Sequence, residues 1–578
     1  MTDDLKAFFL TPQTPKQRQY EALRAYVLEG LSAKEAAERF GFTEATVYAL
    51  AHSLRARQLE LFAPLPPGPK GRRVTPYGRE RIVQLRKQPL SVTEIVAQLD
   101  TEHISVSART VERILKEAGF GKLPRRSVAQ QGLSKNHTLL PEPAHNLVLE
   151  ELEPFYHECQ IAGLFTFVPY LIESGILDVA ERLPLPVSGR VGKTQALLSF
   201  LALKLIGGER LCHIRQYDHD SGLGLFAGLN VLPKPTYAGT YSCLLSASLC
   251  RTLQQELVAR LRNSDPGAFA GATINLDFHS IPHFGEQSEM EQVWCGARHK
   301  AMKGANTFFA QDAETKALLY ANADVLRQDG AAEVLHFVQY WQHLKGVVNE
   351  TLVFDSRLTN YRVLGQLDEA EIKFITLRTR SARLKAQTAD LNDDQWQTVK
   401  LPIPKRKHQT FLAHESEVTL RHCPRPFRQI IMKDHGRAEP TYVITNNRAL
   451  PLVEVLIIYA RRWRVENKLA ELVDFFNLNA LSSPIMVRIH FDLLLSVLAS
   501  FLYRRLAQDL PRFEHHLAPT IFRRFIDMPG KVRFDGHGFE VRIRKHAHTP
   551  ILLGVKKLQQ PIAVPWLDGR PLRLVFTP

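Results

Sequence analysis

The segment 272–377 constrains the fold most, because short apolar runs there surround one helical pattern and two of the runs end in an acid. The runs 272–277 and 351–355 end in Asp277 and Asp355. The other predicted strands are 306–311, 317–323 and 372–377, and 330–344 has a helical period. With a further helix between 355 and 372, the order is three strands, a helix, a strand, a helix and a strand.

This order predicts an α/β fold with a ribonuclease-H-like core. In that arrangement the first and fourth strands lie side by side, so that Asp277 and Asp355 come together. A third acid from a later helix would complete a cluster of carboxylates. Such a cluster is strongly destabilising unless divalent cations neutralise it, and two Mg²⁺ ions that bridge a scissile phosphate are its obvious purpose.

The helical pattern at 450–476 supplies the third acid, Glu466. At about 100° per residue, Tyr459, Arg462 and Glu466 fall within about 60° of one another on one face of a regular helix. The acid can hold a metal ion while the arginine and the phenol hold phosphate oxygens. The alternative is a solvated basic face of an ordinary surface helix.

Tyr459, Arg462 and Glu466 also match the signature Tyr-x2-Arg-x3-Glu-x6-Lys, and the chain resembles the DDE transposases of bacterial insertion sequences that carry it. The lysine position of the signature holds Val473. Lys468 would project about 180° from Tyr459 in a regular helix, so it is no substitute. The stretches 275–285, 300–305, 353–359 and 474–481 are also similar to these enzymes.

The resemblance implies a DNA transposase that binds the terminal inverted repeats of a mobile element. It would cleave the element's ends with two Mg²⁺ ions, or Mn²⁺ as a substitute, and join the 3′-hydroxyl ends to target DNA by cut-and-paste. Asp277, Asp355 and Glu466 would be the catalytic metal ligands, and Tyr459 and Arg462 would contact DNA. A homodimer or higher assembly on double-stranded DNA is also implied.

Residues 33–52 fit a helix-turn-helix. Gly41 would form the turn and Thr43 would cap the second helix. Small or apolar side chains would pack the two helices together; they are Ala37, Val47 and Leu50. The exposed start of the second helix would then present Glu44, Thr46 and Tyr48 to DNA. An ordinary helical hairpin is the alternative.

A second helical unit follows at 78–121. Its segment 107–116 is predicted to be another recognition helix, which presents Arg109, Thr110 and Arg113. The Pro- and Gly-rich segment between the two units is predicted to be an extended arm. Its basic residues would follow a minor groove or form a plain solvated linker; they are Lys70, Arg72 and Arg73.

The predicted domain plan covers the whole chain. The DNA-reading part comprises a helix-turn-helix domain at 1–62, a basic linker at 63–77, a second helix-turn-helix-like domain at 78–121 and a linker at 122–144. A helical intermediate domain is expected at 145–270. The ribonuclease-H-like core is expected at 271–383 and 441–505, with a β-rich insertion at 384–440 and a basic C-terminal region at 506–578.

Charge and composition agree with a nucleic-acid partner. The formal net charge is +15 and the isoelectric point is about 9.5. Residues 1–130 hold 21 Lys and Arg against 14 Asp and Glu, a net charge of +7. Six scattered cysteines favour reduced thiols over a zinc ribbon. Apolar runs such as 493–502 are too short to span a bilayer. Composition therefore predicts a soluble intracellular protein without a membrane partner, and the resemblance implies a bacterial, nucleoid-associated protein of the cytoplasm.

Two alternatives stay open. The first is a domesticated DNA-binding regulator whose chemistry has lapsed, which the missing signature lysine favours and the three acids disfavour. The second is a structure-selective nuclease. A zinc pair of His279 and His283 is not expected, because Pro282 keeps them off a shared helix face, and a DNA contact or a core position fits them better.

Overall fold

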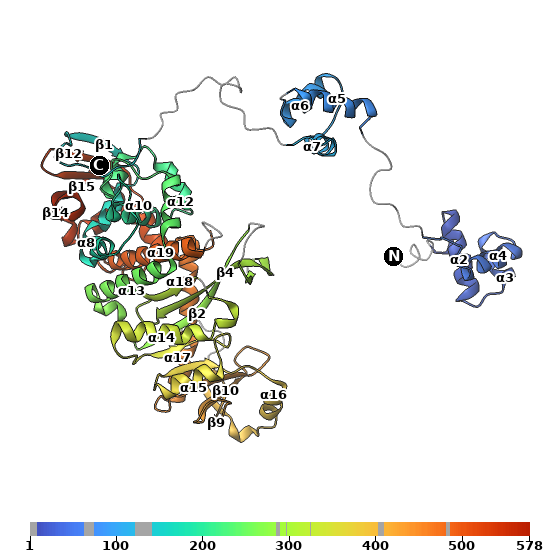
Figure 1. Cartoon of the computed structure of the whole chain (residues 1–578). Helices are drawn as coiled ribbons and strands as arrows, with labels where there is room; N and C mark the ends of the chain where they lie inside the picture. Colours follow the sequence, from blue (N-terminus) through green and yellow to red (C-terminus); the bar gives the residue numbers. More distant parts are fainter. Residues whose placement is uncertain are drawn as a thin grey trace. The chain divides into compact units, whose positions relative to one another are not determined.

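The structure is a computed structural model that describes residues 9–62, 74–88, 90–121, 142–284, 290–295, 298–323, 325–402, 410–480 and 486–577, without the side chains of 463–467. The chain divides into two compact units, Met1–Thr138 and Leu139–Pro578 (Figure 1). Each unit is described by itself.

The first unit begins with three helices, α2 (Pro15–Val27), α3 (Ala33–Phe40) and α4 (Glu44–Arg55). Ser32 and Glu35 form a capping box at the start of α3, and the Thr43 side chain accepts from the Thr46 N–H at the start of α4. Gly41 lies between α3 and α4 with φ +70°, a conformation that glycine adopts without strain. The two helices predicted within 33–52 are present, with the turn at Gly41 and the cap at Thr43.

Three further helices follow in the first unit, α5 (Pro76–Lys87), α6 (Val92–Thr101) and α7 (Ala108–Glu117). Each begins at a hydroxyl side chain that accepts a backbone N–H; the caps are Thr75, Ser91 and Ser107. The apolar faces of the helices meet in one core made of Ile82, Leu85, Ile95, Leu99, Val111, Ile114 and Leu115.

The second unit contains a ten-stranded mixed sheet. Its order is β3-β4-β2-β6-β7-β11-β10-β9-β8, and β5 also pairs with β4. The strands of its first half are β2 (Thr273–Pro282), β3 (Gln292–Cys295), β4 (Lys300–Asp312), β5 (Leu318–Asn322), β6 (Thr351–Val353) and β7 (Phe374–Leu377). Helices α14 (Ala332–Lys345) and α15 (Tyr361–Glu369) precede β6 and β7. β2 pairs antiparallel with β4 and parallel with β6, so the predicted first and fourth strands are adjacent, as in a ribonuclease-H-like core.

Two strands differ from the sequence prediction. β2 does not end at Asp277 but continues to Pro282, and β4 begins at Lys300 rather than at 306. β3 was not predicted at all. The added residues of β4 are exposed at Lys300 and Ala301, and they do not show the apolar run by which a buried strand is recognised.

The insertion continues the same sheet. It contains α16 (Ala382–Ala389), β8 (Gln397–Lys400), β9 (Thr410–Val418) and β10 (Phe427–Lys433), and β11 (Thr441–Thr445) follows it. β11 pairs antiparallel with β7 and joins the insertion to the core strands. The β-rich character predicted for 384–440 agrees with these strands.

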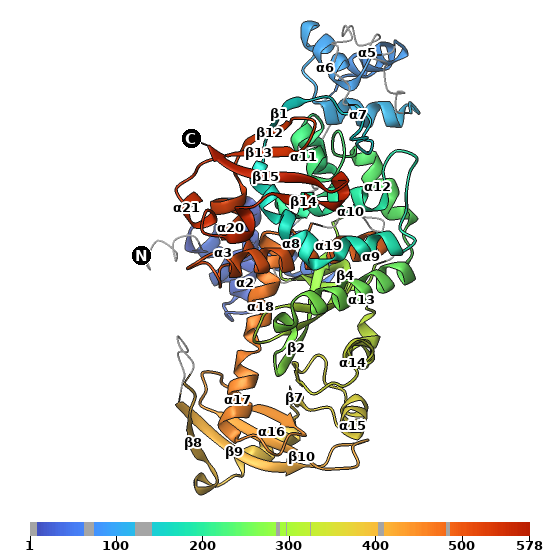
Figure 2. The same ribbon diagram turned by 90° about the vertical axis from the view of Figure 1, so that its left-hand side faces the viewer.

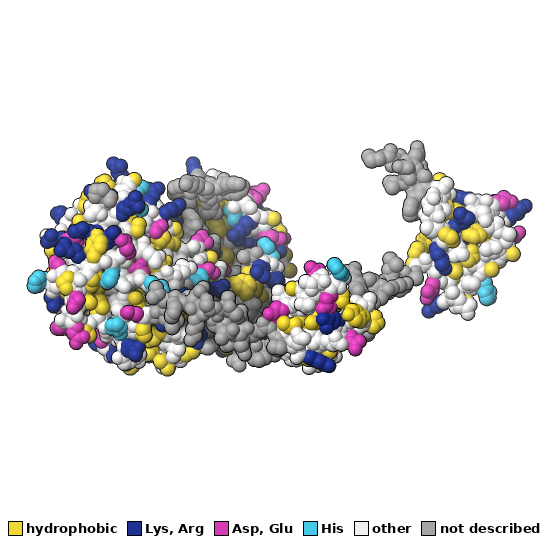
Figure 3. All heavy atoms as spheres, turned by 90° about the horizontal axis from the view of Figure 1, so that it is seen from above, with side chains coloured by type: hydrophobic (Ala, Val, Ile, Leu, Met, Phe, Trp, Pro, Cys, Tyr) yellow, Lys and Arg dark blue, Asp and Glu magenta, His cyan; other side chains and the backbone are white. Residues whose placement is uncertain are grey.

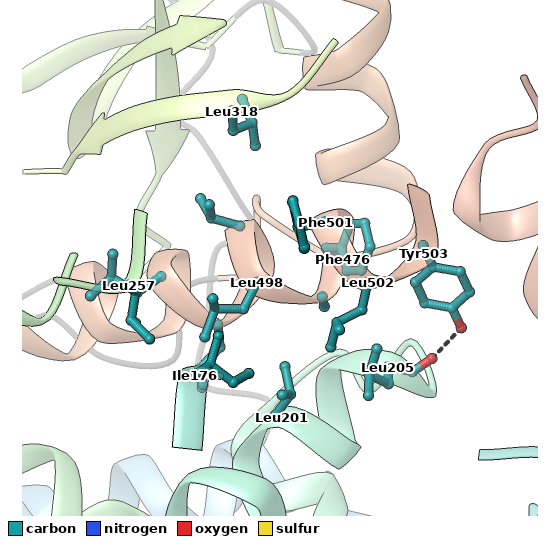
Figure 4. Packing of buried hydrophobic residues seen from close by; sticks show 14 of the residues in the cluster. Ile176, Leu201, Leu205, Leu257, Leu318, Phe476, Leu498, Phe501, Leu502 and Tyr503 are labelled. Atoms are coloured by element: carbon teal, nitrogen blue, oxygen red, sulfur yellow. Dashed lines mark hydrogen bonds between the residues drawn. The ribbon is translucent and has the colours of Figure 1, made fainter. Parts of the chain in front are cut away.

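The helical part of the second unit packs around α19 (Met486–Gln508), which contacts α10 (Lys193–Leu205) and α13 (Ala247–Ser264). Other helices here are α8 (Val168–Ser174), α9 (Ile176–Arg182), α11 (Ser221–Phe226) and α12 (Pro235–Leu244). At 23 residues α19 is long and apolar enough to cross a membrane, but 78% of its most apolar window is buried inside the protein. Its close packing is that of a core helix (Figure 4).

The C-terminal region contributes a second sheet, of order β1-β12-β13-β15-β14 (Figure 2). Its strands are β1 (Phe155–Cys159), β12 (Gly530–Phe534), β13 (Phe539–Arg544), β14 (Ile562–Val564) and β15 (Arg570–Thr577), and the short helices α20 (Ala518–Ile521) and α21 (Thr549–Leu552) lie beside them in sequence. β1 pairs with β12, so residues 155–159 and the C-terminal region form one sheet. In Figure 3, Lys and Arg side chains gather on the left side of the larger unit, where Figure 1 places this sheet.

Candidate active site

The strand register brings the two predicted aspartates to the same level of the sheet. β2 and β6 are parallel, with Thr273 opposite Thr351 and Asn275 opposite Val353. Asp277 lies two residues after Asn275 within β2, and Asp355 lies two residues after Val353, just beyond the end of β6. Neighbouring strands are about 4.8 Å apart, so the two acids leave adjacent positions at the carboxyl end of β6. The adjacency of the two strands that carry these acids, expected from the sequence, is confirmed.

An arginine from the predicted signature contacts the first acid. Arg462 Nη1 lies 3.2 Å from Asp277 Oδ2, and each side chain is only 15% exposed. The other carboxylate oxygen of Asp277 accepts the N–H of Phe278 at 2.9 Å. Because the pair is largely shielded from water, its attraction is stronger than that of a surface ion pair.

The helix that carries Arg462 is not continuous, and the expectation of one regular helix over 450–476 is wrong. α17 (Leu452–Arg461) ends and α18 (Trp463–Asp474) begins on either side of Arg462. The Arg462 N–H bonds the carbonyl of Tyr459 at 3.1 Å, a three-residue bond that tightens the helix locally. The backbone of Glu466 lies in the first half of α18, and its side chain is outside the described residues.

Tyr459 lies beside the same arginine. Burial raises the pKa of the Tyr459 phenol, and the Arg462 guanidinium, which is hydrogen-bonded to it, opposes this rise. Asp355 is close enough to add to the rise in pKa. The structure therefore brings together Asp277, Asp355, Tyr459 and Arg462, four of the five core residues predicted from the sequence.

Arg357, which was not predicted as a site residue, also belongs to this cluster. Its backbone N–H donates to Asp355 Oδ1 at 2.9 Å, and its Nη2 donates to Asn306 Oδ1 at 2.7 Å. Its guanidinium lies 4.7 Å from the centre of the Phe278 ring. Burial lowers the pKa of Arg357, and the carboxylates of Asp355 and Asp277 oppose this change. A second cation thus stands beside both acids.

His279 helps to dock the segment after α18 onto β2. Its Nε2 lies 2.7 Å from Asn479 Oδ1, and burial lowers the pKa of the imidazole, which favours the neutral form. Among the side chains that the structure describes, no group of three or more His, Cys, Asp and Glu could hold a metal ion.

Neither Val473 nor Lys468 supplies the phosphate contact of the signature lysine. Val473 is half-buried and packs against the main hydrophobic core. Lys468 is buried and forms an ion pair with Glu471, whose other carboxylate oxygen accepts the N–H of Ala518 at 2.8 Å. A lysine in place of Val473 would disturb this packing.

The predicted DNA-reading residues lie in the first unit. Glu44 and Tyr48 are exposed on α4, and Thr46 is half-buried beside the capping residue. On α7, Arg109 and Arg113 are exposed and Thr110 is half-buried. The predicted arm residues Lys70, Arg72 and Arg73 are outside the described residues.

Comparison with known proteins identifies one protein family. Residues 273–502 match the family described as Transposase DDE domain. Similar solved structures include a piggyBac transposase synaptic complex with hairpin DNA, at 9% identity over 64% of this chain and 87% of that chain, with a TM-score of 0.31. A Mos1 transposase paired-end complex with the left transposon end is 10% identical over 62% of this chain and 77% of that chain, with a TM-score of 0.14. No curated protein matches. The family match spans β2 to α19 and supports a DDE transposase family for this chain.

Proposed function

We propose that the protein is a DNA transposase that binds the terminal inverted repeats of a mobile element, cleaves its ends and joins them to target DNA by cut-and-paste. The observation that carries the proposal is the parallel register of β2 and β6, which sets Asp277 level with Asp355 beside Arg462. The match of this region to the transposase domain supports the same activity.

The donor atoms at this place suit a hard divalent cation. Asp277 and Asp355 offer carboxylate oxygens, and Glu466, on the helix that packs against β2, would add a third carboxylate. These three residues would hold two Mg²⁺ ions, with Mn²⁺ as a substitute. When bound, the ions would supply charge neutralisation at the scissile phosphate and lower the pKa of the attacking water.

The chain's own cations would position the DNA strand. Arg462 already contacts Asp277, so a phosphate held at that acid would be within reach of its guanidinium. An arginine can grip a phosphate with two parallel hydrogen bonds. The Tyr459 phenol stays protonated because burial raises its pKa, so it can donate to another phosphate oxygen. Arg357 is tied to Asn306 and would keep the Asp355 loop in place.

Arg462→Lys is expected to retain binding to the element's ends but to slow cleavage and joining by about 10- to 100-fold. Lysine keeps the charge but lacks the planar fork, and the loss corresponds to roughly 1.4–2.8 kcal/mol of positioning. Single-turnover cleavage of a labelled end duplex measures the rate. Arg461→Lys, one residue away at the end of α17 and exposed, is the matched control. A fully active Arg462→Lys variant would show that this side chain does not position the strand.

The first unit is expected to bind one inverted repeat on its own, in the absence of the second unit of the chain. A fragment ending near Ala144 contains both helical groups with their own buried apolar residues. Its affinity for the repeat should fall steeply with salt because counterions are released from DNA. Fluorescence anisotropy at about 0.15 M salt measures the affinity of the fragment for the repeat and for random DNA. Equal affinity for both would move sequence recognition out of this fragment.

A domesticated DNA-binding regulator is the second candidate, because Val473 replaces the signature lysine and is packed against the core. The position of the gene separates the two functions. Short inverted repeats around the gene, flanked by a target duplication, would support transposition, and their absence would favour the regulator.

A further inference from the structure

The face of the sheet that carries Asp277 extends onto the hairpin formed by β3 and β4, as the strand register shows. Residues that pair across antiparallel strands share a face, and so do residues two apart on one strand. The pairs that follow this face away from the acid are Asp277 with Phe309, His279 with Thr307, Ile281 with Ala305, Lys303 with Gln292, and Ala301 with Trp294. Trp294 therefore lies on the same face of the sheet as the first catalytic acid.

The outer part of this face is open to solvent. Trp294 is 60% exposed, whereas its neighbours Val293 and Cys295, which point to the opposite face, are each only 6% exposed. Near Asp277 the face is covered, because Arg462 and Asn479 contact β2 there. The exposure of Trp294 thus comes from a regular strand alternation that leaves a large aromatic side chain without cover.

The hairpin combines this aromatic side chain with positive charge. The segment 298–303 contains Arg298, Lys300 and Lys303 and no acid. Phe284 is also 60% exposed, and the Arg298 guanidinium lies 4.7 Å from the centre of its ring. Exposed aromatic rings interleaved with Lys and Arg are typical of nucleic-acid contacts, since the rings pack on sugars or bases and the cations bind phosphates.

The base of the hairpin is fixed to the sheet. The N–H of Gly304 donates to the carbonyl of Glu291 at 3.0 Å, and the N–H of His283 donates to the carbonyl of Lys303 at 2.7 Å. Gly304 is needed at this point because a Cβ would lie 2.3 Å from the carbonyl oxygen of Ile281. A side chain placed on this hairpin is thereby held at a defined distance from Asp277.

We propose that the β3–β4 hairpin is a DNA-binding arm that holds the duplex beside the cleaved end. This inference rests on the proposed function. Phe309, opposite Asp277, and Ala301, opposite Trp294, are eight positions apart on β4. At about 3.3 Å per residue the separation is about 26 Å, which corresponds to about 8 bp of duplex. Lys303 binds backbone phosphates along this path, and Trp294 packs on the sugars at its outer end.

The test uses the full-length protein and end duplexes. Each duplex extends about 15 bp from the cut on both sides, or about 5 bp on one side, which is either the repeat side or the flank side. For the wild type, shortening on one side should weaken binding about 10-fold. On the long duplex, Trp294→Ala and Lys303→Ala should each weaken binding about 5- to 10-fold. When the duplex is shortened, the affinity of these two variants should fall less than the affinity of the wild type, because the variants already lack the distal contact.

Tyr156→Ala is the matched control, because Tyr156 is an aromatic residue that is 50% exposed on β1 of the other sheet. Thermal unfolding should be unchanged in all three variants. If the wild type cleaves the ends and Trp294→Ala binds every duplex as tightly as the wild type does, the arm is overturned and the proposed function stands. An equal loss by Trp294→Ala on long and short duplexes would also overturn it. If the wild type cleaves no end duplex, the proposed function itself fails.

Discussion

Asp277→Asn, Asp355→Asn and Glu466→Gln are each expected to reduce strand cleavage by at least about 10³-fold, which corresponds to roughly 4 kcal/mol of lost transition-state stabilisation. Each substitution removes one negative charge from the set that would hold the divalent ions, while it keeps the shape of the side chain. Binding to the element's ends should stay nearly intact, because specific binding depends mainly on the first unit and on phosphate contacts.

Single-turnover cleavage and end binding are measured side by side for the three variants. Asp474→Asn is the matched control, since Asp474 is exposed at the end of α18, the helix that carries Glu466. A variant that cleaves at a rate near that of the wild type would remove its residue from the catalytic set. Equal losses of binding and cleavage would point instead to misfolding or to a DNA-binding role.

Asp492→Leu is expected to lower the free energy of unfolding of the second unit by about 3–5 kcal/mol, because it leaves a buried ammonium without its partner. Lys204, on α10, is 2% exposed, and its Nζ lies 3.0 Å from Asp492 Oδ2 on α19. The same Nζ donates to the carbonyl of Phe476 at 3.1 Å, just after α18. The pair thus links the core helix to the segment that follows the proposed catalytic helix.

Urea unfolding of the full chain measures this effect. The double variant Lys204→Met with Asp492→Leu should recover most of the lost stability, because two apolar side chains replace the buried pair. A loss of less than about 1 kcal/mol in Asp492→Leu would show that water or another group satisfies Lys204.

Local features of the fold were predictable from the sequence. Gly41 and Thr43 determine a turn and a cap through contacts within a few residues, and they occupy those positions in the structure. The adjacency of β2 and β6 was predictable because each is a short apolar run before an acid and the order of elements restricts their pairing.

Long-range pairings were not predictable in the same way. β1 pairs with β12, although about 370 residues separate them in the sequence, and nothing in the local pattern of 155–159 specifies that partner. The hairpin of β3 and β4 was missed because its exposed residues, such as Trp294 and Lys300, do not give the apolar run of a buried strand.

The candidate site was predictable in its acids and in Arg462, but the contacts of its cations were not. The helical period placed Tyr459 and Arg462 on one face, yet it could not show that the helix breaks at Arg462 or that this side chain bonds Asp277. Arg357 follows Asp355 by two residues, within the stretch 353–359 that resembles the transposases, but no motif singled it out. The position of Arg357 beside both acids depends on its contacts with Asn306 on β4 and Phe278 on β2.

Cleavage mapping on the element's own ends tests the central claim most directly. The purified full-length protein is incubated with an end-labelled duplex that spans the junction between the inverted repeat and its flank, with Mg²⁺, with Mn²⁺ and with a chelator. The account predicts a new 3′-hydroxyl at the outer end of the repeat in either metal, none with the chelator, and none with Asp277→Asn. Cleavage that persists in the chelator or in Asp277→Asn, or no cleavage at the repeat end in either metal, would contradict it.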